Sequence, residues 1–185
     1  MSGKINLRFG ILLLMILAAA LSRLLPHPFN FTPIGAMALF GAAYFSNKKL
    51  AFILPFAAMW LSDLWINNLM YDNGGTFQWM GSAWVYGSFI MISMLGLIAL
   101  KRVRVGAVLG TSLLASILFF LITNFSVWYG SVAYPKSIAG LMLCYEAGIP
   151  FFWNTLAGDL FYCAVLFGGF EFAQRRVPAL SRLAS

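Results

Sequence analysis

The sequence predicts an all-α membrane protein with six transmembrane helices and both termini in the cytoplasm, and two observations support this. First, the chain of 185 residues is 62% hydrophobic and 9% charged, with a mean hydropathy of +0.87. Such a composition offers too little polar surface to cover a soluble globule. Second, ten of the twelve Lys and Arg residues form four clusters at the ends of paired apolar segments. The clusters are Lys4 with Arg8, Lys48 with Lys49, Lys101 with Arg102 and Arg104, and Arg175 with Arg176 and Arg182.

Because positive charge concentrates on the cytoplasmic side of membrane proteins, the four clusters predict a chain that crosses outward and back three times. The net charge of +7 would suggest nucleic acid in a soluble protein. Here the basic residues are dispersed beside the bilayer ends of apolar segments, where orientation and anionic lipid headgroups account for them. We therefore expect membrane lipid, and no nucleic acid, as a partner.

The six predicted spans form one transmembrane domain over residues 1–185. They cover residues 9–25, 32–46, 50–69, 82–100, 105–125 and 149–171, and together use about two thirds of the chain at ~20 residues per span. The second span is short and rich in Gly and Ala, which favours close packing inside the bundle. Three outer connections are expected at residues 26–31, 70–81 and 126–148, of which the last is unusually long and therefore a candidate functional loop.

Two alternatives concern the first span and the cysteines. The basic and apolar start of the chain, followed by Ala18, Ala19 and Ala20, also resembles a cleavable signal peptide. Removing it would leave five spans, whereas the charges favour an even number, so we keep it as a helix. Cys144 is expected in the outer loop and Cys163 ~20 Å down the last helix, so no disulfide is expected.

Three charged residues fall within predicted spans, where charge is costly and needs a partner or a purpose. Asp63 shares a helical face with Trp60 and Asn67. Asp159 lies near the middle of the last span, and Arg23 ends the first span at a comparable outer depth. In the structural interpretation, Arg23 neutralises Asp63, Asp159 or both as an ion pair. In the functional interpretation, these groups line a water-filled pocket, and both interpretations can hold together.

Aromatic and amide side chains gather at the outer ends of the predicted helices, whereas the inner boundaries carry no Trp. A membrane-interface belt explains single Trp and Tyr residues, but amides and an imidazole are more typical of a concave site that orients a ligand. The candidate ligand-binding residues are His27, Asn30, Asp63, Asn67, Met80, Trp84, Tyr86, Asn124, Trp128, Tyr145, Trp153, Asn154 and Asp159.

Enzymatic motifs are largely missing from the sequence, and we do not expect an enzyme. There is one histidine, and there is no nucleophile elbow, phosphate loop or Cys-x-x-Cys pair. An intramembrane aspartyl hydrolase using Asp63 and Asp159 remains an alternative if the two carboxylates are close together. A purely structural assembly protein, with neither pocket nor ligand, is a further alternative.

Several segments resemble a family of small bacterial membrane proteins related to the S-components of energy-coupling-factor vitamin transporters. The most specific is the run RLLPHPFNFTPIGAMALFG at residues 23–41. The others are Ser62-Asp63, Phe119-Phe120, Thr123-Asn124-Phe125, Trp128 and Gly158-Asp159-Leu160. The resemblance covers most of the chain. It implies a multi-pass protein of the bacterial cytoplasmic (inner) membrane, with six helices and an outward-facing site for a vitamin.

The resemblance also implies a mechanism, in which the small protein topples in the membrane to release its vitamin inward, usually on an ATP-driven coupling module. Docking on that module uses an Ala-x-x-x-Ala pattern in the first helix. This chain has Ala18 followed by Ser22 there, and Ala38 followed by Ala42 in the second span. This departure favours a solitary member of the family.

Among solitary members, the chain looks closest to those that take up cobalamin, which bind the corrinoid cobalt through a cysteine thiolate. Met80 stands at the corresponding place, and its thioether is a weaker soft ligand. His27 is the other candidate cobalt ligand, since prolines on both sides hold it in extended geometry. We therefore expect a cobalamin importer, with cobalamin as transported ligand rather than prosthetic group. Another vitamin or heteroaromatic precursor is the alternative substrate.

Overall fold

The computed structural model describes residues 7–71 and 74–180, and these residues form helices and no strands. Lys4 and Arg182, which belong to the predicted basic clusters, lie outside the described residues. The elements are α1 (Leu7–Ser22), α2 (Ile34–Tyr44), α3 (Lys48–Trp65), the π-helical turn η1 (Ile66–Met70), α4 (Ala83–Ala99), α5 (Val105–Gly130), α6 (Ile138–Cys163), the π-helical turn η2 (Ala164–Gly168), α7 (Gly169–Arg176) and the short 3-10 turn η3 (Pro178–Leu180).

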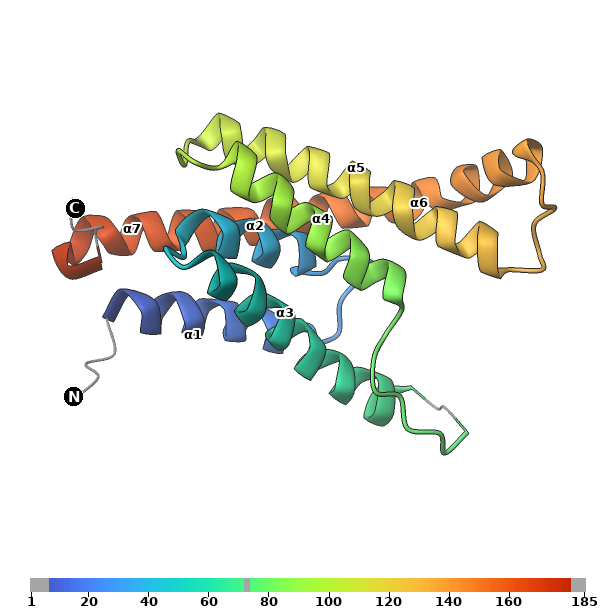
Figure 1. The fold of residues 1–185 in the computed structure, drawn as a ribbon, viewed down its shortest axis with the longest axis horizontal. Coiled ribbons are helices and arrows are strands. Elements are labelled where there is room, and N and C mark those ends of the chain that lie inside the picture. The colour runs from blue at the N-terminus through green and yellow to red at the C-terminus, as the bar shows by residue number, and fades with distance from the viewer. Residues whose placement is uncertain (1–6, 72–73, 181–185) are drawn as a thin grey trace.

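The helices form an up-and-down bundle in which successive rods run in opposite directions (Figure 1). The segment from α6 through η2 to α7 is one helical rod, Ile138–Arg176, so six rods make up the described bundle. The start of α1, the end of α7 and the α2–α3 and α4–α5 connections lie at one end, on the left in Figure 1. The described basic clusters belong to these segments. The α3–α4 and α5–α6 connections lie toward the opposite end, whereas the α1–α2 connection lies between the two ends.

Helix α2 is the centre of the bundle, as its small residues predict. All of its residues are buried, and it contacts α1, α3, α4, α5 and α6. A Cβ atom on Gly41 would lie 2.6 Å from Pro55 Cγ of α3, and one on Gly96 of α4 would lie 2.9 Å from Ala42 Cβ. These glycines let the backbones of neighbouring helices approach closely.

The predicted outer loop at residues 126–148 is wrong, because most of it is helical. Helix α5 continues to Gly130 and α6 already begins at Ile138, which leaves a connection of residues 131–137. The side chain of Ser137 caps α6 by accepting a hydrogen bond from the Gly140 backbone N–H at 3.2 Å. The sequence predicts a last span that begins at residue 149, whereas α6 begins at Ile138 and continues through Pro150.

Three helical rods are long and apolar enough to cross a membrane within the described residues: Lys48–Met70, Val105–Gly130 and Ile138–Arg176. The rods Leu7–Ser22, Ile34–Tyr44 and Ala83–Ala99 are apolar but shorter. The first ends at Ser22 rather than at residue 25, and the second begins at Ile34 rather than at residue 32, because residues 23–33 are not helical; the second also ends at Tyr44, before the predicted residue 46. At 1.5 Å per residue, α2 is about 16 Å long, roughly half a hydrocarbon core.

Side chains from both ends of the chain close the end of the bundle at which α1 begins. Arg8 of α1 is buried and donates a hydrogen bond to the backbone oxygen of Leu180. Its guanidinium carbon lies 5.0 Å from the ring centroid of Phe170, a cation–π contact. The hydroxyl of Tyr44 donates to Glu171 Oε1 at 2.5 Å. These contacts tie α1 and α2 to α7 at this end.

Candidate functional site

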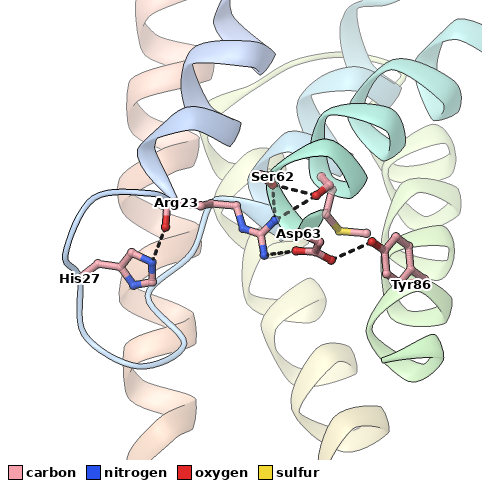
Figure 2. A network of polar contacts seen from close by, with 6 residues as sticks. Arg23, His27, Ser62, Asp63 and Tyr86 are labelled. Atoms are coloured by element: carbon pink, nitrogen blue, oxygen red, sulfur yellow. Dashed lines mark hydrogen bonds and ion pairs between the residues drawn. The ribbon is translucent and has the colours of Figure 1, made fainter. Parts of the chain in front are cut away.

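A buried ion pair joins the end of α1 to α3 and α4 (Figure 2). Arg23 Nη2 lies 2.6 Å from Asp63 Oδ1, and the two side chains are 10% and 9% exposed. The other carboxylate oxygen, Oδ2, accepts a hydrogen bond from the Tyr86 hydroxyl at 2.7 Å. The prediction that Arg23 neutralises a carboxylate is therefore confirmed, with Asp63 as its partner.

The guanidinium of Arg23 makes two further contacts to α3 through Nη1, which donates to Ser62 Oγ at 2.5 Å and to the Met59 backbone oxygen at 3.2 Å. Its Nε atom is buried and has no hydrogen-bond partner among the described residues. Gly81, just before α4, is close to the pair, because a Cβ atom there would lie 3.1 Å from Asp63 Oδ2. The segment before α4 therefore covers the carboxylate.

Asp159 contacts a different set of groups, at the N-terminus of α2. Its Oδ2 accepts a hydrogen bond from Ser116 Oγ of α5 at 2.7 Å, and the backbone N–H of Ala36 is hydrogen-bonded to the carboxylate. Pro33 precedes α2 and provides no side-chain cap. A helix N-terminus has unpaired N–H groups and a partial positive charge, so Asp159 supplies the cap from α6. Gly35 makes this approach feasible, since its Cβ would lie 2.9 Å from Asp159 Cγ.

A cavity of about 410 Å³ lies between α5, α6 and the α1–α2 connection. Its wall is mostly aromatic and aliphatic, with a few hydroxyl and amide groups and no charged side chain. It is lined by Phe29, Asn30, Val85, Phe119, Phe120, Thr123, Asn124, Val127, Tyr134, Cys144, Ala147, Gly148, Phe151, Phe152 and Thr155. This size and composition are typical of a small-molecule site.

A second cavity of about 240 Å³ adjoins the first, and its wall is polar on the side of the ion pair. Its lining residues are Arg23, Asn30, Thr32, Ile34, Asp63, Ser82, Val85 and Phe119. The two cavities share Asn30, Val85 and Phe119. Asn30 is also the described non-glycine residue with a positive φ, 64°, a conformation that asparagine tolerates better than most residues.

The α1–α2 connection at residues 23–33 is held against the helices by several contacts. Asn154 Nδ2 of α6 donates to the Phe29 backbone oxygen at 3.0 Å. A Cβ atom on Gly158 would lie 3.0 Å from the Thr32 backbone nitrogen, near the middle of the Ile138–Arg176 rod. His27 folds back on its own loop, with Nδ1 2.9 Å from the Pro28 oxygen and Nε2 3.3 Å from the Arg23 oxygen. These contacts hold the loop against α6, while its residues 25–30 remain exposed.

Of the predicted ligand-binding residues, Asn30 and Asn124 line the larger cavity, and Asn30 and Asp63 line the smaller. Tyr86, Asn154 and Asp159 support the loop and helices around them through the hydrogen bonds described above. Tyr145 packs on Phe120 of the cavity wall, with centroids 5.6 Å apart, and donates to the Leu121 oxygen. The structure does not place His27, Asn67, Met80, Trp84, Trp128 or Trp153 on either cavity wall.

Two of the predicted aromatic residues, Trp84 and Trp128, belong to a separate cluster between the start of α4 and the end of α5. Trp84 packs against Phe125 with centroids 5.7 Å apart, and Phe125 packs against Trp128 at 5.5 Å. Trp153 is 62% exposed and Met80 46% exposed. The predicted cobalt ligands His27 and Met80 are both exposed, and each ring nitrogen of His27 faces a backbone oxygen. No group of three or more His, Cys, Asp or Glu residues suited to a metal ion occurs among the described residues.

Sequence reasoning missed most of the cavity wall. Five of the missed residues lie in the segment 126–148, which it placed in a loop: Val127, Tyr134, Cys144, Ala147 and Gly148. Gly140, Cys144 and Gly148 recur every four residues and are all buried, and this spacing indicates a helix face in close contact. A Cβ atom on Gly148 would lie 2.8 Å from Asn124 Cγ of α5. Asn68 was also missed: its amide donates to the Gln78 oxygen and its Oδ1 accepts from the Gln78 N–H, which fixes the segment before α4.

The fold and the site together define a class: an all-helical protein with three helices of membrane-spanning length, a buried ion pair and two adjoining cavities at one end. The chain belongs to the family of unknown function DUF6580, whose pattern matches residues 3–180. No curated protein matches the sequence, and no solved structure does.

Proposed function

We propose that this protein is a substrate-binding membrane importer of the S-component type, which takes up a small vitamin or a heteroaromatic vitamin precursor. The observation that carries the proposal is the shortness of α2. Its 11 residues span about half a hydrocarbon core, and the irregular segment at residues 23–33 completes the crossing. Irregular backbone at membrane depth is tolerated where it lines a cavity or is buried in protein, and this segment borders both cavities.

Six crossings with both ends on the cytoplasmic side fit the arrangement of the rods. The described basic clusters belong to segments at one end of the bundle, and the cavities lie toward the other. With the basic end in the cytoplasm, the cavities open toward the outside of a bacterial inner membrane. An importer requires its substrate site on that side.

The size and lining of the larger cavity favour an uncharged aromatic ligand. Its volume of about 410 Å³ lies in the range of roughly 300–1,000 Å³ found for sites of drug-sized ligands. Cobalamin, with a macrocycle and a nucleotide arm, is considerably larger than such ligands. It remains the substrate named by the sequence resemblance, but it would require the outer ends of α5 and α6 to move apart.

The positions of the two aspartates argue against a hydrolase. Asp63 is paired with Arg23 and accepts a hydrogen bond from Tyr86, whereas Asp159 caps α2 and contacts Ser116. An aspartyl hydrolase needs two carboxylates that share a proton and face the substrate. Here Asp159 lines neither cavity.

A stability assay tests the proposal directly. The protein is placed in lipid nanodiscs, and its thermal unfolding is measured with riboflavin, thiamine, biotin or cobalamin added singly. A ligand at 100 times its Kd stabilises the folded state by about 2.7 kcal/mol, and bound cobalamin also gives visible absorbance. Ala147→Phe, which fills the larger cavity, should abolish the effect. Ala157→Phe, on an exposed position of α6 away from both cavities, is the matched control.

Two results would refute the proposal. One is that no vitamin or heteroaromatic precursor raises the unfolding temperature of the wild-type protein. The other is that Ala147→Phe leaves uptake unchanged in a strain whose growth depends on the compound that binds.

A further inference from the structure

We infer that a groove between α3 and α4 binds one acyl chain of an anionic phospholipid, whose headgroup contacts Lys49 at the basic end of the bundle. The groove shares no wall residue with the two cavities, so the inference does not depend on what they bind. It goes further than a general attraction of basic residues to anionic lipid, because it assigns one headgroup contact and one surface for the chain.

The groove has a volume of about 390 Å³ and is open at the side of the bundle. It is lined by Phe52, Ile53, Phe56, Ala57 and Trp60 of α3 and by Ile90 of α4. None of these side chains is charged, and Ile53 and Ile90 are 56% and 43% exposed, so a molecule from outside the bundle can reach the wall. The rod Lys48–Met70 is long enough to span a membrane, and its groove therefore faces hydrocarbon.

Aromatic contacts fix the floor and the outer end of the groove. Phe56 packs on Tyr86 and Phe89 of α4, with ring centroids 5.1 and 6.0 Å apart. The indole N–H of Trp60 donates to the Trp79 backbone oxygen at 2.8 Å, so the segment before α4 holds this ring at the outer end. The groove is therefore formed before any ligand arrives, and an acyl chain extends along it from the start of α3 toward Trp60.

Lys49 continues the face of the groove toward the basic end. It precedes Ile53, Phe56 and Trp60 by four, seven and eleven residues, a spacing that places all four on one side of a helix. Lys49 is exposed, and helical side chains lean toward the N-terminus of their helix, which here is the basic end. From Lys49 to Trp60 the helix rises about 16 Å, close to half of a hydrocarbon core of about 30 Å. A phosphate on Lys49 therefore leaves the depth of one leaflet for the chain.

The start of α3 carries positive charge that no ion pair with the described residues neutralises. Lys48 and Lys49 are its first two residues, and its first turn contains no acidic residue. A helix N-terminus already has a partial positive charge, so cations are unfavourable there and anions are favourable. An anionic headgroup at Lys49 offsets both contributions.

The wall favours a flexible chain over another transmembrane helix. Helices associate in membranes through small residues that let backbones approach and through hydrogen bonds between helices. Among the residues that line the groove, Ala57 is the small one, and the Trp60 N–H is already paired. An acyl chain requires neither feature, because it can follow an irregular apolar surface.

The test uses phosphatidylglycerol that carries a photoreactive diazirine in one acyl chain, and phosphatidylcholine with the same chain. Each lipid is added to the full-length protein in nanodiscs of unlabelled phosphatidylcholine. After irradiation, peptide mass spectrometry maps the cross-linked residues, and native mass spectrometry measures how tightly each lipid is retained.

Two variants, each with a matched control, separate the headgroup contact from the chain contact. Lys49→Gln removes the headgroup contact, and Lys48→Gln is its control, since Lys48 is exposed and lies about 100° away around the helix. Ala57→Trp fills the groove, and Ala157→Trp, at an exposed position of α6 outside it, is the second control. Thermal unfolding shows which variants are folded, and Lys49→Gln decides by itself if Ala57→Trp is not.

We expect cross-links of phosphatidylglycerol to concentrate at residues 52–60. Lys49→Gln should weaken its retention about fivefold, which corresponds to about 1 kcal/mol, and leave phosphatidylcholine unchanged. Lys48→Gln should have a clearly smaller effect. Ala57→Trp should remove the cross-links at residues 52–60, whereas Ala157→Trp should preserve them.

Three results would overturn the inference. Cross-links spread over the exposed residues of all helices, with equal retention of both lipids, would mean ordinary boundary lipid. Equal effects of Lys48→Gln and Lys49→Gln would mean that the headgroup is not held on the face of the groove. A disulfide-linked dimer of Ile53→Cys in membranes would mean that a second copy of the chain covers the groove, since the native cysteines are buried.

Discussion

Arg23 Nη2 lies 2.6 Å from Asp63 Oδ1, so an ion pair that is about nine-tenths buried joins the residue after α1 to α3. The same carboxylate accepts from Tyr86 of α4. Three helices therefore converge on one carboxylate (Figure 2). Because buried charges are tolerated when paired and hydrogen-bonded, each partner is expected to be necessary for the others.

A double-mutant cycle measures this dependence. Arg23→Met leaves the Asp63 carboxylate unpaired, and we expect a loss of about 3–5 kcal/mol in the free energy of unfolding. Combining it with Asp63→Leu should recover most of that loss, because no buried charge remains. Unfolding in mixed detergent and denaturant provides the measurement. Arg102→Met, at an exposed position, is the control, with a change below about 0.5 kcal/mol. Additive losses in the double variant would show that the pair is not energetically coupled.

Tyr86→Phe removes one hydrogen bond from Asp63 and leaves the ring in place. Tyr86 is 4% exposed, so water does not readily replace its hydroxyl, and we expect a loss of about 1–3 kcal/mol. The ring contact with Phe56, at 5.1 Å between centroids, should persist. The same unfolding assay measures the change. An unaltered stability would mean that water or another group takes over from the hydroxyl.

Two glycine substitutions test the close packing of α5 and α6. Gly148→Ala places a Cβ atom 2.8 Å from Asn124 Cγ and 3.0 Å from Phe120 Cε2. These side chains must turn away or the helices must move apart, and we expect a loss of about 1–3 kcal/mol in the free energy of unfolding. Gly110→Ala in α5 meets nothing within 4 Å and should stabilise the helix by about 0.5–1 kcal/mol. If Gly148→Ala and Gly110→Ala change the free energy of unfolding by the same amount, the close packing of α5 and α6 at Gly148 is contradicted.

Cysteine labelling tests the orientation in the membrane. The sequence placed Cys144 in the outer loop, but in the structure it is in α6 and 2% exposed, and Cys163 is 1% exposed. Both are free thiols, as expected, and an impermeant maleimide should leave the wild-type protein unlabelled on intact cells. Val132→Cys, at a fully exposed position, should be labelled from outside, and Lys48→Cys should not. If Lys48→Cys is labelled from outside and Val132→Cys is not, the orientation in the membrane is the opposite of the one proposed.

The helical class, the number of rods and the arrangement of their ends could be predicted from the sequence. Apolar length and the positions of basic residues are local properties, and they are read without knowing which helices touch. The central position of α2 could also be predicted, because Gly and Ala permit close approach whatever the neighbour. The partnership of Arg23 with a carboxylate followed from the cost of buried charge.

Only the tertiary structure determines which of the two carboxylates, Asp63 or Asp159, pairs with Arg23. Both carboxylates lie in apolar helices, and only the bundle brings one to Arg23 and the other to the N-terminus of α2. Likewise, the helix across Pro150 packs against α5 through Cys144 and Gly148, which both contact Asn124, and local breaker signals do not report such long-range contacts. The cavities depend on the same packing. Their walls come from the α1–α2 and α5–α6 connections and from α2, α3, α4, α5 and α6, which converge only in the folded bundle.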